Sequence, residues 1–251
     1  MTEPIPGRLG RPDGNTVAYH RTAGGAPAVV FCGGLMSDMT GTKAMALEAF
    51  CRARGQAFVR FDYLGHGASS GRFEDGTIGR WAEDAVAVID ALTEGPVVLV
   101  GSSMGGWIMV LAALARRERV RALVGVAAAP DFTRRMAAHG LTADQRARLA
   151  RDGHIEVPSD YGEQPYVITR ALIDDGETRC LLDRAIGLDC PVRLLHGVND
   201  ATVPWQASLR LMDALASADV TLTLVKNGDH RLSGPADLER LCAAVAEVSG
   251  R

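Results

Sequence analysis

The chain has 251 residues, of which 47% are hydrophobic and 23% are charged, and its formal net charge at pH 7 is −3. This composition suffices for one globular domain of the larger kind, and the charge gives no reason to expect nucleic acid or an anionic membrane as a partner. Five cysteines are scattered without CxxC spacing, which argues against a disulfide framework or a cysteine zinc site and suits a reducing compartment. The first residues lack an apolar signal segment and no apolar run is long enough to span a membrane, so we expect a soluble, cytoplasmic protein.

Short apolar runs along the chain predict strands, and most of the runs are nearly continuous, as expected for strands buried on both faces of a sheet. They cover residues 28–32, 57–62, 97–101, 122–128, 192–196 and 220–225. Helical patterns lie between and after these runs, at residues 45–55, 81–95, 104–117 and 235–248. Strands that alternate with helices indicate an α/β fold with a mainly parallel central sheet flanked by helices.

Residues 131–188 interrupt this alternation. They contain no strand-like run, and helical pieces such as 141–153 and 166–174 fill the segment, the first with Thr142 and Gln145 at the spacing of a capping box. An insertion of this length far exceeds an ordinary connection in an α/β domain. We therefore predict an α/β core from residues 1–130 and 189–251, and a helical cap from residues 131–188, inserted before the penultimate strand and laid over the open end of the sheet.

The segment VVLVGSSMGGW (97–107) contains the pattern Gly-x-Ser-x-Gly centred on Ser103. Ser102 does not fit the pattern, because its neighbours two positions away are valine and methionine. Ser69 fits it, but loop sequence lies on both sides of Ser69. Ser103 alone stands between an apolar strand and an apolar helix, the context in which a sharp turn exposes a nucleophilic serine. The sequence therefore predicts Ser103 as the nucleophile.

A nucleophilic serine needs a histidine base, and on this scaffold the expected chain order is serine, acid, histidine. His154 lies in the cap with no strand before it, and His196 ends a strand but precedes the best acid candidate. His230 follows the last strand in a glycine-containing loop before the final helix. Its position predicts His230 as the base.

The acid that orients the base is predicted to be Asp200, which lies in the loop after the penultimate strand. Asp229 is adjacent to His230, and neighbouring loop residues rarely hold each other's side chains well, so Asp229 suits a turn better. Asp219 precedes a strand and so belongs to the opposite end of the sheet. These alternatives leave Asp200 as the preferred acid.

An oxyanion formed during acyl transfer needs two backbone N–H donors. One is predicted from Met104, the residue after the nucleophile, and the other from the loop FCGGLMSD, where Leu35 is the preferred donor. Gly33 and Gly34 allow the backbone of that loop to turn inward.

Four side chains are candidates for an acyl-binding pocket: Met36, Trp107, Met136 and Tyr166. Methionine and aromatic side chains adapt to flexible apolar chains. Packing between cap and core explains each of them at least as well, above all Trp107 on the helix after the nucleophile.

In this order, the motifs FCGGLMSD, RFDYLGHGASSG, GSSMGGW, LLHGVNDATVPW and GDHR resemble the α/β-hydrolase superfamily. Longer segments, such as GSSMGGWIMVLAALAR and CPVRLLHGVNDATVPW, are similar to the family of mitochondrial acyl-protein thioesterases (S-depalmitoylases) that also cleave the acyl glucuronide of mycophenolic acid. The resemblance implies Ser103, Asp200 and His230 as the triad and the hydrolysis of acyl thioesters or esters. It does not imply the same location, because that family carries a mitochondrial transit peptide and this sequence starts without one.

We therefore expect a serine esterase or thioesterase that uses no metal or organic cofactor and acts on a small-molecule or protein-linked acyl substrate. Asp62 is predicted to tie down the loop after its strand. One alternative is another chemistry on the same scaffold, such as that of a peptidase, lactonase, perhydrolase or acyltransferase. A second, less favoured, is a non-catalytic binding module. The sequence indicates no nucleic-acid partner and no particular oligomeric state.

Overall fold

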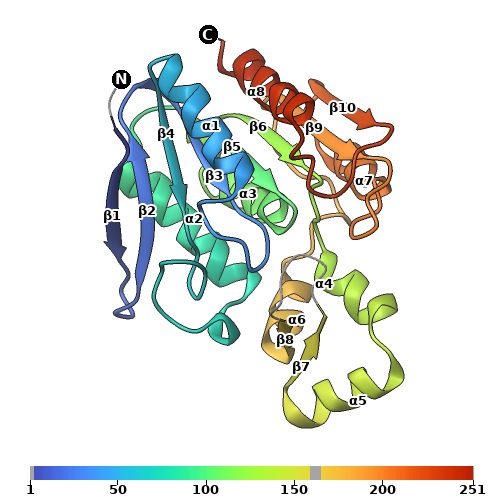
Figure 1. Ribbon diagram of the computed structural model, residues 1–251. Helices are drawn as coiled ribbons and strands as arrows, with labels where there is room; N and C mark the ends of the chain where they lie inside the picture. Colours follow the sequence, from blue (N-terminus) through green and yellow to red (C-terminus); the bar gives the residue numbers. More distant parts are fainter. Residues whose placement is uncertain (1–2, 159–164, 251) are drawn as a thin grey trace.

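The computed structural model describes residues 3–158 and 165–250, and an eight-stranded sheet forms its centre (Figure 1). In chain order the strands are β1 (Ile5–Gly10), β2 (Thr16–Thr22), β3 (Gly25–Cys32), β4 (Gln56–Phe61), β5 (Val97–Ser102), β6 (Val120–Val126), β9 (Val192–Gly197) and β10 (Val220–Val225). Their order across the sheet is β1-β2-β4-β3-β5-β6-β9-β10, and all pairs from β4 to β10 are parallel. The predicted α/β class with a mainly parallel sheet is confirmed.

Helices cover both faces of the sheet, which explains why its central strands are apolar along their whole length. On one face lie α1 (Thr42–Ala53) and α8 (Pro235–Ser249), which share a buried cluster with β5 and β6. On the other lie α2 (Ile78–Leu92), α3 (Met104–Ala115) and α7 (Gln206–Ala214). Every residue of β5 is buried, so its carboxyl end is held rigidly at the centre of the molecule. Within the described ranges, no helix is long and apolar enough to cross a membrane.

The two N-terminal strands were not predicted from the apolar pattern. β1 and β2 pair in antiparallel fashion, and β2 continues the sheet beside β4. β1 is an edge strand with four of its six residues exposed, so it needs no apolar run.

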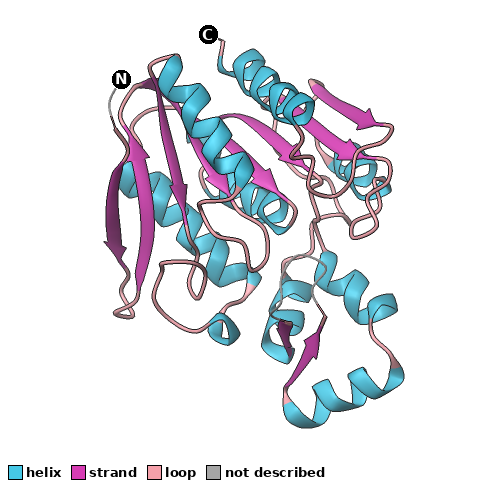
Figure 2. Ribbon diagram, in the orientation of Figure 1, coloured by secondary structure: helices cyan, strands magenta, loops and turns pink. Residues whose placement is uncertain are grey.

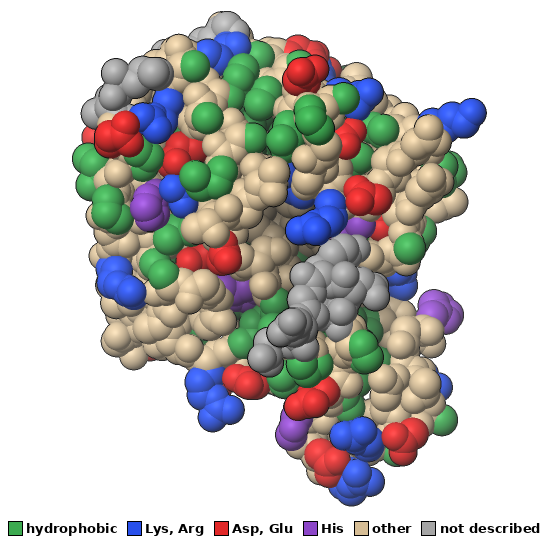
Figure 3. Space-filling view, in the orientation of Figure 1, with side chains coloured by type: hydrophobic (Ala, Val, Ile, Leu, Met, Phe, Trp, Pro, Cys, Tyr) green, Lys and Arg blue, Asp and Glu red, His purple; other side chains and the backbone are tan. Residues whose placement is uncertain are grey.

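Between β6 and β9 the chain leaves the sheet and forms a separate lobe (Figures 1 and 3). The lobe contains α4 (Phe132–Arg135), a π-helical turn (Met136–Gly140), α5 (Ala143–Asp152), β7 (His154–Val157), β8 (Tyr166–Thr169) and α6 (Arg170–Thr178). Thr142 and Gln145 form the predicted capping box at the start of α5. Charged side chains gather on the outer end of this lobe (Figure 3). We call residues 131–188 the cap, and their limits stay a prediction.

The cap is not built from helices alone, and this part of the prediction is wrong. β7 and β8 form a two-stranded antiparallel sheet, so residues 166–169 are a strand and not the start of a helix (Figure 2). Both strands are only four residues long, and Tyr166, Val167, Ile168 and Thr169 all favour extended backbone. A run so short lacks the length at which helix and strand periods can be told apart.

Asp131 anchors the start of the cap to its end. Its backbone takes a left-handed conformation (φ 55°), and its buried carboxylate accepts hydrogen bonds from the backbone N–H groups of Leu181 (2.8 Å) and Leu182 (3.0 Å). One side chain thus satisfies two amides where the chain returns from α6 toward the sheet.

Replacing Asp131 by alanine should leave both amides without an acceptor and lower the free energy of unfolding by about 2 kcal/mol. Chemical denaturation measures this loss, and limited proteolysis should cut the cap earlier than in the wild type. The matched control is Asp213→Ala, at an exposed position on α7. Equal stability of the two variants would contradict the role given to Asp131.

Candidate active site

Ser103 lies at a sharp turn between the end of β5 and the start of α3, with φ 55° and ψ −122°. A side chain at Gly101 would overlap the carbonyl oxygen of Gly105, and one at Gly105 would overlap the carbonyl oxygen of Cys32. Only glycine therefore permits strand and helix to meet so closely at this turn. The strained backbone directs the Ser103 hydroxyl away from the sheet and into a cavity.

Ser103, His230 and Asp200 form a continuous chain of hydrogen bonds. His230 Nε2 lies 3.1 Å from Ser103 Oγ, and His230 Nδ1 lies 2.7 Å from Asp200 Oδ2. The carboxylate can only accept, so Nδ1 carries the proton, and Nε2 is left to accept from the serine hydroxyl. The three residues come from three different loops at the carboxyl end of the sheet, after β5, β9 and β10.

The Asp200 side chain is fully buried, and four donors surround its carboxylate. Oδ1 accepts the backbone N–H groups of Thr202 (2.9 Å) and Val203 (2.8 Å), and Oδ2 faces both His230 and His196. Burial alone would raise the pKa of Asp200, but the hydrogen bonds from His196, His230 and Val203 outweigh it and hold the pKa well below its usual range. The carboxylate therefore stays ionised beside the imidazole.

His196 is the member of this network that the sequence analysis left out. It is completely buried, and its Nε2 lies 3.1 Å from Asp200 Oδ2 and 3.0 Å from the carbonyl oxygen of Val203. Both of these atoms are acceptors, so Nε2 carries the proton and Nδ1 accepts from the Ser208 hydroxyl at 2.7 Å. His196 was set aside as the base, and its contact with Asp200 instead fixes the position of the acid. The four-residue spacing to Asp200 was the available signal.

Leu35 and Met104 both lie on the cavity wall beside Ser103. A β-carbon on Gly34 would stand 3.5 Å from Ser103 Cβ, which places the peptide between Gly34 and Leu35 against the nucleophile. Within the described residues, no acceptor pairs with the N–H of Leu35 or of Met104. Two donors therefore remain available next to Ser103, the arrangement that an oxyanion requires.

The cavity above Ser103 has a volume of about 850 Å³ and lies between core and cap. Its cap side includes the apolar or aromatic side chains of Phe132, Met136, Leu141, Tyr166 and Ile168, together with Arg135 and His139. Met36 lines it from the core side and is 38% exposed. Three of the four proposed pocket residues, Met36, Met136 and Tyr166, therefore lie on the cavity wall.

Trp107, the fourth candidate, lies in the core and not on the wall that bounds the cavity in the described chain. Its ring packs edge-on against Phe132 with centroids 5.8 Å apart, and its indole N–H donates to the carbonyl oxygen of Arg179 at 3.2 Å. It sits one turn beyond Ser103 on α3, on the side that contacts the cap residues Phe132 and Arg179. Trp107 therefore packs between core and cap, which is the alternative to a pocket role that its sequence position also allowed.

The rejected candidates lie in other roles. His154 is exposed on β7, Asp229 accepts the backbone N–H groups of Arg231 and Leu232, and Asp219 pairs with Arg193. Asp62 accepts the backbone N–H groups of Met39 (2.6 Å) and Ala68 (2.8 Å), so it holds the loops after β3 and β4 together, in line with its predicted role.

Comparison with known proteins is consistent with this site. Residues 29–248 match the alpha/beta hydrolase family. The crystal structure of a protein from Agrobacterium vitis S4 has a TM-score of 0.93 and 40% sequence identity and covers 98% of both chains. The structure of alpha/beta hydrolase domain-containing protein 10 from mouse has a TM-score of 0.90 and 40% identity, and covers 97% of this chain and 98% of that one. Palmitoyl-protein thioesterase ABHD10, mitochondrial, from Bos taurus is 43% identical over 241 residues, which are 96% of this chain and 78% of that protein.

The chain belongs to the alpha/beta hydrolase family. The family and the fold that the sequence motifs predicted are confirmed, and the names of the relatives agree with the predicted class of enzyme, an esterase or thioesterase.

The expectation of a cytoplasmic location is wrong in the light of the palmitoyl-protein thioesterase relatives, which are named as mitochondrial. It rested on the composition of the first residues and on unpaired cysteines. Unpaired cysteines suit any reducing compartment and do not distinguish one from another.

The lowered pKa of Asp200 makes a prediction for stability against pH. In the unfolded chain an aspartate titrates near pH 4, so as the pH falls the unfolded state takes up this proton first, and the stabilisation by ionised Asp200 is lost. In Asp200→Asn this loss is absent, and the free energy of unfolding should fall less steeply between about pH 5 and pH 2. Denaturant titrations over this range measure the slope. The exposed control Asp213→Asn should keep the wild-type slope, and a wild-type slope in Asp200→Asn would contradict the assignment.

Proposed function

We propose that the protein is a serine hydrolase that cleaves acyl thioesters and esters, and that long acyl chains carried on protein cysteines are its leading substrates. The observation that carries the proposal is the hydrogen-bonded chain of Asp200, His230 and Ser103, whose serine lies on a cavity with apolar side chains on its cap side. This is the geometry of a nucleophile, a base and an orienting acid.

In the first half of the reaction, His230 Nε2 takes the proton from Ser103 Oγ while this oxygen attacks the acyl carbonyl carbon. The imidazolium that forms is stabilised by Asp200, whose carboxylate stays ionised. The carbonyl oxygen becomes an oxyanion and receives hydrogen bonds from the N–H groups of Leu35 and Met104. When the bond to the leaving group breaks, His230 gives its proton to the departing thiol or alcohol, and an acyl-enzyme ester on Ser103 remains.

In the second half, water occupies the place of the leaving group. His230 takes a proton from this water, its oxygen attacks the acyl carbonyl, and the same two N–H groups stabilise the second oxyanion. Collapse of this intermediate releases the carboxylic acid, and His230 returns its proton to Ser103 Oγ. No step calls for a metal or an organic cofactor.

The cavity supports an apolar acyl group. Phe132, Leu141 and Ile168 are almost completely buried and present their side chains beside the more flexible Met136. These side chains can bind an alkyl chain through burial of apolar area. The name of the relatives, palmitoyl-protein thioesterase, agrees with a long acyl chain and with protein as its carrier.

A fluorophosphonate probe should label Ser103 in the purified protein, as mapped by mass spectrometry. Ser103→Ala should abolish labelling and reduce hydrolysis of a palmitoyl thioester by at least about 10⁴-fold, because the nucleophile is lost. His230→Ala should slow labelling strongly. The matched control is Ser102→Ala, next to the nucleophile but outside the hydrogen-bonded chain, which should keep labelling. Absence of labelling in well-folded wild-type protein would favour the binding-module alternative.

Met136→Trp should narrow the acyl side of the cavity and so select against long chains. We expect kcat/KM for a palmitoyl thioester to fall tenfold or more, about the effect of misfitting a few methylenes, while acetyl and butyryl thioesters change less than about twofold. Met45→Trp is the control, since Met45 is 42% exposed on α1 and does not line the cavity. A uniform loss over all chain lengths would contradict the placement of the acyl chain under the cap.

A further inference from the structure

The loop that carries Leu35 is held by a histidine that takes no part in the proposed mechanism. His66 is 3% exposed, in the loop after β4, and its Nε2 accepts the backbone N–H of Met36 at 3.1 Å. Its Nδ1 lies 3.1 Å from the carbonyl oxygen of Leu64. An amide N–H only donates and a carbonyl only accepts, so this ring is neutral and carries its proton on Nδ1.

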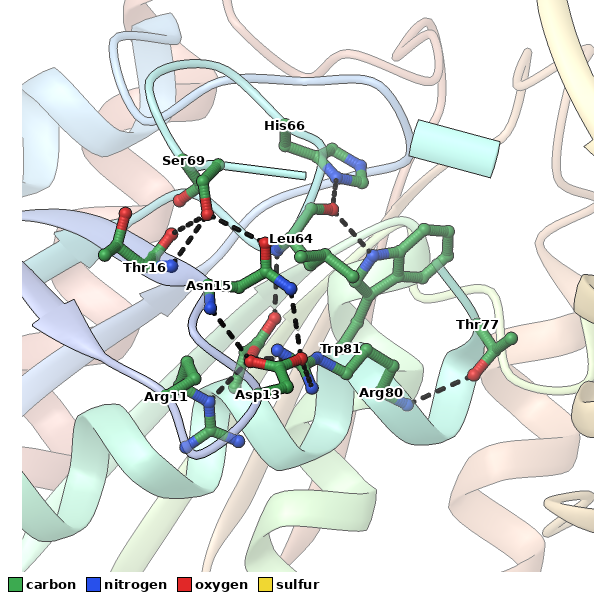
Figure 4. Close-up of polar contacts among 12 residues, drawn as sticks. Arg11, Asp13, Asn15, Thr16, Leu64, His66, Ser69, Thr77, Arg80 and Trp81 are labelled. Atoms are coloured by element: carbon green, nitrogen blue, oxygen red, sulfur yellow. Dashed lines mark hydrogen bonds and ion pairs between the residues drawn. The ribbon is translucent and has the colours of Figure 1, made fainter. Parts of the chain in front are cut away.

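The ring of His66 has little freedom to move. The carbonyl of Leu64 that accepts its N–H also accepts the indole N–H of Trp81 at 3.1 Å, so two buried rings converge on one oxygen (Figure 4). Tyr63, Phe73 and Trp81 surround the imidazole edge-on, with centroids 5.1–5.5 Å away. The backbone N–H of Leu64 is itself bound by the buried carboxylate of Asp84 at 2.9 Å.

The contact is made at a strained point of the loop. Met36 has φ 52°, a left-handed conformation that is costly for a residue with a side chain and persists only where the surroundings impose it. The adjacent peptide of Leu35 lies next to Ser103, as the approach of Gly34 to Ser103 Cβ requires. Once the N–H of Met36 is fixed on His66, the direction of the Leu35 N–H follows from the turn.

We propose that His66 is a positioning residue, which holds the backbone of Met36 in its left-handed turn and thereby aims the Leu35 N–H at the oxyanion; this role rests on the proposed function. His66 touches neither substrate nor Ser103, and acts only through the loop. Its role thus differs from that of His230, which transfers protons, and from that of His196, which holds Asp200 in place.

The surroundings of His66 keep it neutral. Burial lowers its pKa to about 4, and the hydrogen bond to Leu64 only partly opposes this. Tyr63, which packs against the ring, is an uncharged phenol. The carboxylate of Asp84 accepts the N–H of Leu64 and forms ion pairs with Arg11 (3.1 Å) and Arg80 (3.5 Å). Nε2 therefore remains an acceptor throughout the neutral pH range, where a protonated ring would turn an N–H toward the N–H of Met36.

The test compares wild type with His66→Phe, which fills the ring cage without hydrogen bonds, and His66→Gln, whose amide offers both a donor and an acceptor. The control is Phe73→Leu, which loosens the cage but leaves both hydrogen bonds of His66 intact. With a palmitoyl thioester, kcat of His66→Phe should fall about 10- to 100-fold with KM within about twofold, the pattern of a misplaced oxyanion donor. His66→Gln should recover most of this loss, and Phe73→Leu should keep kcat near wild type.

Hydrogen–deuterium exchange over residues 33–39 provides a readout that does not need turnover. Exchange should rise in His66→Phe and return toward wild type in His66→Gln. The proposal is overturned if His66→Phe and the control Phe73→Leu show the same kcat and the same exchange rates. It is also overturned if His66→Gln restores slow exchange without restoring kcat. If the wild-type protein hydrolyses no acyl substrate, the proposed function is rejected. If exchange over residues 33–39 is unchanged in His66→Phe, the role of His66 in holding the loop is rejected, whatever the activity.

If His66→Phe does not fold, ¹⁵N NMR of the wild type still decides the contact. A scalar coupling between the Met36 amide nitrogen and His66 Nε2, together with ring shifts of the Nδ1-protonated tautomer, is the expected result. An Nε2-protonated ring at neutral pH would reject the proposal, because such a ring cannot accept the Met36 N–H.

Discussion

The backbone strain at Ser103 is the constraint on which the rest of the site depends. A side chain in this conformation is unfavourable by itself, so the neighbouring structure must impose it. The amide of Ser103 donates to the carbonyl oxygen of Val126, and its carbonyl accepts the N–H groups of Gly106 and Ala129. These bonds tie the turn to β6 and α3, two elements whose residues are almost all buried. The stability of the whole sheet thus keeps one hydroxyl exposed.

A second constraint is the burial of a carboxylate. The Asp200 side chain is removed from water, and burial of its charge is possible because four hydrogen-bond donors face its two carboxylate oxygens. Two donors are backbone groups of its own loop and two are histidines, one within β9 and one after β10. The acid is therefore fixed independently of the base, because His196 would hold it even as His230 gains and loses a proton. In the role proposed for His66, a buried histidine likewise holds a second part of the site in place.

The sequence was most informative where one physical requirement acted on many neighbouring residues. Strands buried on both faces must be largely apolar, so β3, β4, β5, β6 and β9 stood out, and a parallel sheet brings the loops of Ser103, Asp200 and His230 to one edge. β1 has no such requirement, and β7 and β8 are too short to display a period. Trp107 shows a further limit: residue type marks it as apolar, but only tertiary packing decides between a cavity wall and the core. The contact of His66 with Met36 could not be predicted, since it joins two loops whose separation in space only the fold fixes.

The way the cap joins the core has an evolutionary consequence. β6 and β9, the strands before and after the cap, are hydrogen-bonded neighbours in the sheet. The chain therefore leaves the core and returns to it at two adjacent points. A longer or shorter lobe would leave the register of every strand pair in the main sheet unchanged. Ser103, Asp200 and His230 all stand on loops outside it. A different lobe could be inherited or grafted at the same junction, and the reaction would then persist while the set of acceptable acyl groups diverged.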